Sequence, residues 1–221
     1  MLFRSDAGGR LFTSARLARG DWQSVILGSS RCLRGIDPRS PYFVGLRTFD
    51  ACLSGTNMAE MAPIAEFALA HNPQLKRVLI GLDFEMFTAR RTMSSDYDAS
   101  MLSGKSTTEV TLEYLLSWQT LRRSFSTLAD YFSGRRTDVS DDGSVDMTIL
   151  PPKMTPRGRF DDVLKNGFLL DAASYGAFEY SRRRIADLSR VLAEYKKAGV
   201  VVDMYVSPSH ARQMEAIYAL G

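Results

Sequence analysis

The sequence predicts an α/β fold, a three-layer α/β/α sandwich with a doubly wound, mainly parallel sheet. Four short runs of aliphatic and aromatic residues have the length of buried parallel strands, and amphipathic helical patterns lie between them. Alternating strands and helices are typical of parallel sheets with right-handed crossovers, and we expect a flavodoxin-like strand order. With 221 residues, 45% of them hydrophobic, the chain is long enough to bury the core of such a domain.

The strands are expected where apolar runs are bounded by polar or turn-forming residues, at residues 24–28, about 49–53, 77–84 and 200–206. Between the second and third strands, an apolar face from Met58 to Leu69 predicts a helix, with Pro63 near its first turn or at a kink. Another amphipathic pattern covers residues 175–198, and Gly199 is suited to end that helix. The fourth strand follows at once, as in a βαβ crossover.

Residues 86–170 interrupt this alternation. They contain a loop rich in Ser, Thr and Asp, a helical pattern over residues 107–132, and a stretch rich in Gly, Pro and Asp over residues 133–160. We therefore expect a single domain over residues 1–221, with residues 86–170 as a helical, lid-like insertion. A separate small helical domain is the alternative. The chain stops inside an apparent helix, so we expect a segment of a longer protein, incomplete at both ends.

Composition and charge argue against several classes of function. The formal charge is only +3 and the arginines occur in short clusters, which disfavours nucleic-acid binding. Cys32 and Cys52 are too few for a disulfide framework and lack metal-binding or CxxC spacing. No Gly-rich phosphate loop follows a predicted strand, which argues against a nucleotide-binding domain. We expect no cofactor and no metal. No stretch approaches the ~20 apolar residues that span a bilayer, and the first residues lack the apolar core of a signal peptide.

Polar residues follow each predicted strand. In open α/β sheets the ligand crevice lies beyond the carboxyl ends of the strands, so these residues are the candidate site. The four segments are Gly28-Ser29-Ser30-Arg31, Ser54-Gly55-Thr56-Asn57, Gly81-Leu82-Asp83-Phe84 and Ser207-Pro208-Ser209-His210.

The order of these segments, read as GSSRCLRGIDP, LSGTNMAEM, VLIGLDFEMF and SPSHARQMEA, resembles the SGNH/GDSL hydrolase superfamily. The resemblance covers roughly residues 10–90 and 175–221. It is closest to envelope-associated, often membrane-anchored members linked to extracellular polysaccharide. It implies a serine esterase or O-acyltransferase that acts on carbohydrate esters at the cell envelope or in the periplasm.

The resemblance makes Ser30 the nucleophile, because Gly28 and Ser30 match the Gly-x-Ser of the family. The backbone N–H groups of Ser30 and Gly55 are then expected to form the oxyanion hole. Independently of the family, a serine on a strand-to-helix turn exposes its hydroxyl above the sheet, where backbone N–H groups and the helix dipole favour an oxyanion. Ser29 stands where the family usually has Asp. Two alternatives remain: Ser29 is the reactive serine, or both serines only cap the following helix.

Two further features depart from the family. Asp83 stands where the family has Asn, and a carboxylate donates no hydrogen bond to an oxyanion unless it is protonated. We expect Asp83 to pair with Arg31, which either fixes the turn or leaves the arginine near an anionic or sugar substrate. Such a pair can also be purely structural. Asn57 belongs to the same supporting set.

The Asp-x-x-His that supplies the family's catalytic base is missing from this sequence. His71 lies at the far end of a predicted helix, toward the amino ends of the strands, so we do not expect it to reach the crevice. His210 follows the fourth strand, about 10 Å from the first at about 4.8 Å per strand, and is expected to bind substrate or to cap the next helix. The rival interpretation is a non-catalytic module that binds a polysaccharide or an assembly partner in the same crevice.

Overall fold

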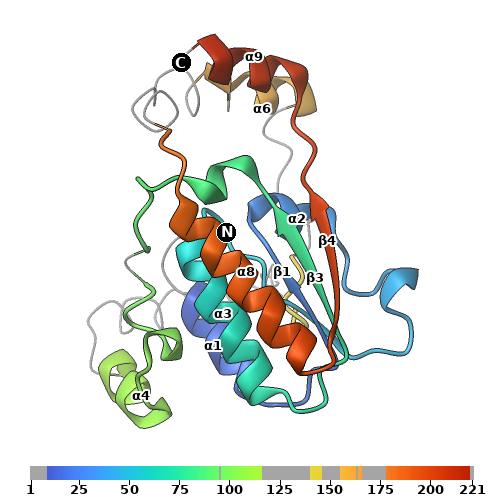
Figure 1. The fold of residues 1–221 in the computed structure, drawn as a ribbon, viewed down its shortest axis with the longest axis vertical. Coiled ribbons are helices and arrows are strands. Elements are labelled where there is room, and N and C mark those ends of the chain that lie inside the picture. Colours follow the sequence, from blue (N-terminus) through green and yellow to red (C-terminus); the bar gives the residue numbers. More distant parts are fainter. Residues whose placement is uncertain are drawn as a thin grey trace, which may run out of the picture.

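The computed structural model describes residues 9–94, 96–115, 140–145, 155–162, 164–165 and 178–219. Its centre is a four-stranded, all-parallel sheet of order β2-β1-β3-β4 (Figure 1). The strands are β1 (Ser24–Leu27), β2 (Thr48–Asp50), β3 (Arg77–Leu82) and β4 (Val201–Val206). The expected α/β class and the parallel sheet are confirmed, with strands in all four predicted places.

Strand β1 lies between β2 and β3, and every one of its residues is buried. A strand covered on both faces needs apolar side chains in both directions, which explains its continuous Val-Ile-Leu run. Val25 and Leu27 enter the larger core cluster on one face, and Ile26 enters a smaller cluster on the other. Helices therefore cover both faces of the sheet.

Three helices cover the face with the larger core, and Figure 1 shows them side by side: α1 (Gly9–Leu17), α3 (Met58–His71) and α8 (Arg182–Lys197). Helix α3 contains Pro63, and its apolar face is the one predicted. The buried Tyr195 of α8 donates a hydrogen bond to the Ala65 carbonyl of α3 at 2.8 Å, so these two helices are fixed to each other as well as to the sheet.

The prediction of a helix over residues 175–198 was wrong at its N-terminal end. Helix α8 begins only at Arg182, and residues 175–177 lie outside the described residues. The Ser181 N–H bonds to the Phe87 carbonyl and the Ala89 N–H bonds to the Glu179 carbonyl, so this part of the chain pairs with residues 87–89. These inter-segment bonds replace the i to i−4 bonds of a helical turn.

Helix α1 was not predicted, because its buried face is largely polar or small: Gly9, Arg10, Thr13, Ser14 and Leu17. The guanidinium of Arg10, 4% exposed, bonds to the Glu60 carboxylate of α3 through Nε at 3.2 Å. Its second partner is Asp96, at 3.1 Å from Nη1. This buried ion group joins α1 to α3 and to the segment around residue 96, in place of apolar contacts.

The short helix α2 (Ser30–Gly35) packs on the opposite face, with the 3₁₀ turn Pro41–Phe43 beside it. Gly28 allows this helix to lie close to the sheet, and Gly81 gives room to a side chain of the neighbouring strand. Gly28 and Gly81 directly follow the paired residues Leu27 and Ile80 of β1 and β3, and we call the gap above them the glycine trough. A Cβ on Gly28 would lie 2.6 Å from the Cβ of Cys32, and a Cβ on Gly81 would lie 2.7 Å from the Tyr205 hydroxyl.

The substitution Gly28→Ala is therefore expected to lower the free energy of unfolding by about 1–3 kcal/mol, because the added methyl overpacks the contact between α2 and the sheet. The matched control is Gly35→Ala in the same helix. Nothing lies within 4 Å of a Cβ at Gly35, so this change is expected to be neutral or to stabilise. Urea unfolding measures the free energy of unfolding of both variants. Equal midpoints for the two variants would contradict the close-packing account.

Within the described part of residues 86–170, no segment forms a strand of the sheet. The helix expected over residues 107–132 is present as α4 (Thr107–Leu115), and residues 116–132 lie outside the description. Most of the expected loop over residues 133–160 also lies outside it, except for residues 140–145 and the start of α6 (Pro156–Asp162). The Asp50 N–H bonds to the Asp142 carbonyl at 2.8 Å, so residues 140–145 lie against the outer edge of β2.

Candidate functional site

The polar segments after the strands meet at one edge of the sheet, as expected. The Leu53 N–H bonds to the Gly28 carbonyl at 3.0 Å, which brings the turn containing Gly55 beside the turn containing Ser30. Asp83 follows β3 directly, and the Ser207 N–H bonds to the Leu82 carbonyl at 2.9 Å. Beyond this edge lie α6 and the last helix, α9 (Ala211–Ala219) (Figure 1).

Ser29 acts as the N-cap of α2. Its hydroxyl accepts the Arg31 N–H at 3.2 Å and donates to the Asp83 carboxylate, and the residue is only 7% exposed. The capping alternative therefore describes Ser29. Because the hydroxyl is occupied on both its donor and acceptor sides, Ser29 joins the β1 turn to the β3 turn.

Ser30 is placed differently. It is the first residue of α2 and is partly exposed, and among the described residues its hydroxyl takes part in no hydrogen bond. Gly55 is exposed in the neighbouring turn with a φ of +71°, a conformation that favours glycine, and nothing lies within 4 Å of a Cβ there. An uncommitted hydroxyl and an open backbone turn thus lie on adjacent strand ends.

Arg31 links the turns after β1, β3 and β4. Its Nη1 lies 3.4 Å from the Asp83 carboxylate, which confirms the expected pair, and the same nitrogen donates to the Ser209 hydroxyl at 3.3 Å. Its Nη2 lies 3.5 Å from the Glu85 carboxylate. Asp83 is 4% exposed and accepts from both Ser29 and Arg31. It therefore serves as an acceptor that positions the turn, not as an oxyanion donor.

Glu85 was not identified from the sequence, and Ser209 was named only as part of the segment that follows the fourth predicted strand. Glu85 lies within a single 3₁₀ turn directly after Asp83, and it also accepts from the Gln213 side chain of α9 at 3.5 Å. The alternation of acids in LDFEMF was the available signal. It could not be used without knowing that Arg31 reaches across two strands.

Asn57 and His210 are both helix caps. The Asn57 side chain accepts the Ala59 N–H at 2.8 Å at the start of α3 and donates to the Thr92 carbonyl at 2.9 Å, so both of its polar ends are occupied inside the protein. His210 is exposed, and its Nδ1 accepts the Arg212 N–H at 3.2 Å at the start of α9. Its ring packs on Phe160 of α6 with centroids 4.4 Å apart. Of the two roles expected for His210, the structure shows the capping role.

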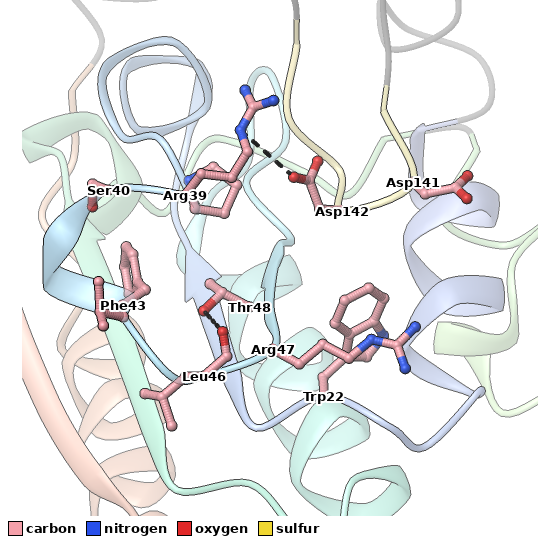
Figure 2. A pocket seen from close by; sticks show the side chains of 11 residues that line it. Trp22, Arg39, Ser40, Phe43, Leu46, Arg47, Thr48, Asp141 and Asp142 are labelled. Atoms are coloured by element: carbon pink, nitrogen blue, oxygen red, sulfur yellow. Dashed lines mark hydrogen bonds and ion pairs between the residues drawn. The ribbon is translucent and has the colours of Figure 1, made fainter.

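A pocket of about 360 Å³ lies away from these residues, beside the amino ends of β1 and β2 (Figure 2). Trp22, Arg39, Arg47 and Asp142 are among the residues that line it. Arg39 pairs with Asp37 and lies 3.9 Å from Asp142, and Arg47 pairs with Asp21 and lies over the Trp22 ring. None of the sequence-predicted site residues lines this pocket.

The described residues contain no group of three or more Asp, Glu, His or Cys side chains placed to hold a metal ion. Over the same residues, no helix has both the length and the apolar character needed to cross a bilayer. Comparisons of the chain with protein-family models, with curated proteins and with solved structures found no match.

Proposed function

We propose that this chain is an SGNH-like serine ester hydrolase or O-acyltransferase that acts on carbohydrate esters of an extracellular or envelope polysaccharide. The proposal includes the finer architecture, a flavodoxin-like sheet with residues 86–170 as a helical insertion. It also places the full-length protein at the cell envelope, with a membrane anchor. The observation that carries it is the free hydroxyl of Ser30 beside the open turn of Gly55, at the carboxyl ends of adjacent parallel strands.

In this proposal the Ser30 oxygen attacks the acyl carbonyl, and the backbone N–H groups of Ser30 and Gly55 donate to the oxyanion that forms. The sugar oxygen then takes up the proton that the Ser30 hydroxyl has lost and leaves as an alcohol, and the acyl group remains on Ser30. Water attacks this acyl-enzyme in hydrolysis, and a second sugar hydroxyl attacks it in acyl transfer. Ser29, Asp83 and Arg31 position the turn, since their bonds to one another join β1 to β3.

The test is to label the protein with a fluorophosphonate, which forms a stable adduct on reactive serines. The tryptic peptide of residues 20–31 contains both Ser29 and Ser30, and fragmentation in the mass spectrometer locates the adduct. We expect a slowly formed adduct on Ser30 at high reagent concentration, because the backbone donors assist attack by its partly exposed hydroxyl even though neither histidine contacts it, whereas the hydroxyl of Ser29 is buried and bound to Asp83.

Three controls make the labelling decisive. The Ser30→Ala variant is expected to lose the adduct, Ser29→Ala is expected to retain it, and protein unfolded in urea is expected to remain unlabelled. An adduct on Ser29 would overturn the assignment of the nucleophile. No adduct on a folded protein would overturn the enzymatic proposal.

The second candidate function is a binding module that uses the same edge of the sheet. The observation that favours it is the commitment of Asp83 to Ser29 and Arg31, which leaves no donor at the position of the family's asparagine. The Arg31 side chain keeps 27% of its surface exposed and can face a sugar or an anionic group. Calorimetry with an O-acetylated polysaccharide tests it: binding that survives Ser30→Ala but weakens in Arg31→Ala, without serine labelling, supports the module.

A further inference from the structure

A row of four residues crosses the sheet at one level on the α2 face. Gly81 is paired with Tyr205 in the β3–β4 register. Gly28 lies opposite Gly81 when the β1–β3 register is continued by one residue. Cys52 completes the row on the β2 side, since its neighbours on either side in the sequence bond to the Ile26 and Gly28 carbonyls. The glycine trough therefore has the Cys52 side chain at one end and Tyr205 at the other.

Cys32, on the first turn of α2, fills this trough. Its sulfur lies 3.0 Å from where a Cβ of Gly28 would be, and 3.8 Å from the Leu27 carbonyl oxygen. Same-face side chains on neighbouring strands start about 5 Å apart. Because the Cβ of Cys32 lies 2.6 Å from where a Gly28 Cβ would be, its side chain takes roughly the place of a β1 side chain beside Cys52. Both cysteines are free thiols in this structure and are buried in the smaller core cluster, at 1% and 0% exposure.

We propose that Cys32 and Cys52 form an intramolecular disulfide that joins the first turn of α2 to the segment after β2. A disulfide needs Cβ atoms about 3.5–4.5 Å apart, and neighbouring side-chain positions on one face of a sheet are about 4.8 Å apart, so the bond needs only a small shift of the Cys32 side chain toward Cys52. The inference concerns a covalent modification of the scaffold and does not rest on the proposed function.

The environment of the pair explains when the bond forms. Burial raises the pKa of the Cys52 thiol, and a hydrogen-bonding contact with the Cys32 thiol raises it further. A buried, protonated thiol is a poor nucleophile, so the closed native protein reacts slowly near neutral pH. The bond therefore forms while the chain folds, before α2 closes over the trough.

The oxidant is a dialkyl disulfide such as oxidised glutathione. The thiolate of one cysteine attacks a sulfur of the oxidant, giving a mixed disulfide and one glutathione thiolate. The thiolate of the other cysteine then attacks the protein sulfur of that mixed disulfide and releases the second glutathione. The protein loses two protons and two electrons, and one glutathione disulfide becomes two glutathione molecules.

The bond has a structural consequence at the candidate site. Cys32 lies two residues after Ser30, and Cys52 lies three residues before Gly55. The disulfide thus fixes covalently the two turns that the Leu53 to Gly28 hydrogen bond holds together in the reduced protein.

The experiment refolds the full chain in oxidised and in reduced glutathione and digests both with trypsin after blocking free thiols. In the oxidised sample we expect residues 32–34 linked to residues 48–76, and no free thiol. The melting temperature of the oxidised monomer is expected to exceed that of the reduced one by at least a few degrees, since the bond restricts the unfolded chain.

The Cys32→Ser and Cys52→Ser variants serve as controls, and each is expected to keep one free thiol and to show no oxidant-dependent melting shift. Either serine substitution can itself lower stability. The presence of the Cys32–Cys52 bond is therefore judged from the peptide map of the wild-type protein alone. Two free thiols in a natively folded oxidised monomer would overturn the proposal. Linkage found only between molecules, or a lower melting temperature of the linked monomer, would also overturn it.

Discussion

Hydrolysis of p-nitrophenyl acetate by this chain is expected to be about 10⁴- to 10⁶-fold slower than hydrolysis by a serine esterase with a complete triad. A serine hydroxyl is a weak nucleophile until a base takes its proton. The sequence has two histidines. His71 bonds to the Phe67 carbonyl at the far end of α3, and Nδ1 of His210 caps α9. Neither of these contacts involves Ser30, so the expected slow reaction is attack by the Ser30 hydroxyl without a base, assisted only by the backbone donors.

Three proteins are compared in this assay: wild type, Ser30→Ala and His210→Ala. We expect Ser30→Ala to fall to the rate of buffer, while His210→Ala retains the wild-type rate. Rapid turnover abolished by both substitutions would show that His210 is the base, and that its imidazole reaches Ser30 instead of only capping α9. A wild-type rate equal to that of buffer would favour the binding module.

Replacing Arg10 by methionine is expected to lower the free energy of unfolding by about 3–5 kcal/mol, because it leaves buried carboxylates without their cation. Glu60 is 1% exposed and Asp96 is 9% exposed, and both face the Arg10 guanidinium. Methionine has similar length and apolar character, so the packing of α1 is largely kept. Chemical denaturation measures the loss.

Two further variants isolate the electrostatic part. Adding Glu60→Gln to Arg10→Met removes one buried charge, so we expect the double variant to recover a substantial part of the loss. The control on the same helix is Arg16→Met, whose partner Asp141 is solvent-exposed, and its effect is expected to be under about 1 kcal/mol. Equal losses for Arg10→Met and Arg16→Met would show that burial of the ion group contributes nothing.

The central strands β1 and β3 were predictable because burial leaves a direct trace in the sequence, a short run of β-branched and aliphatic residues. Leu27, Ile80 and their neighbours form such runs. The edge strand β4 carries such a run although Val201, Met204 and Val206 are exposed. Helix α1 left no such trace, because Arg10 contributes to its buried face and is compensated by Glu60 and Asp96 from elsewhere in the chain. Periodicity reports apolar burial, and it does not report burial that depends on a distant partner.

The candidate site was predictable in its place and in one of its contacts. The carboxyl edge of the sheet follows from strand order, and the pairing of Arg31 with Asp83 follows from opposite charges on adjacent strand ends. It was not predictable that Ser29 would cap α2 and bond to Asp83 while the Ser30 hydroxyl remained unbonded among the described residues. This difference depends on which hydroxyl faces Asp83, and that orientation is set by the helix that begins at Ser30.

Gly28 and Ser30 form a Gly-x-Ser, yet in this structure Gly28 supplies room for Cys32. Gly81 does the same for Tyr205 on the neighbouring strand. The glycine of this Gly-x-Ser is therefore required for close docking of a helix on the sheet, independently of any chemistry at the serine. A chain with both glycines and neither serine is expected to share this scaffold without a nucleophile.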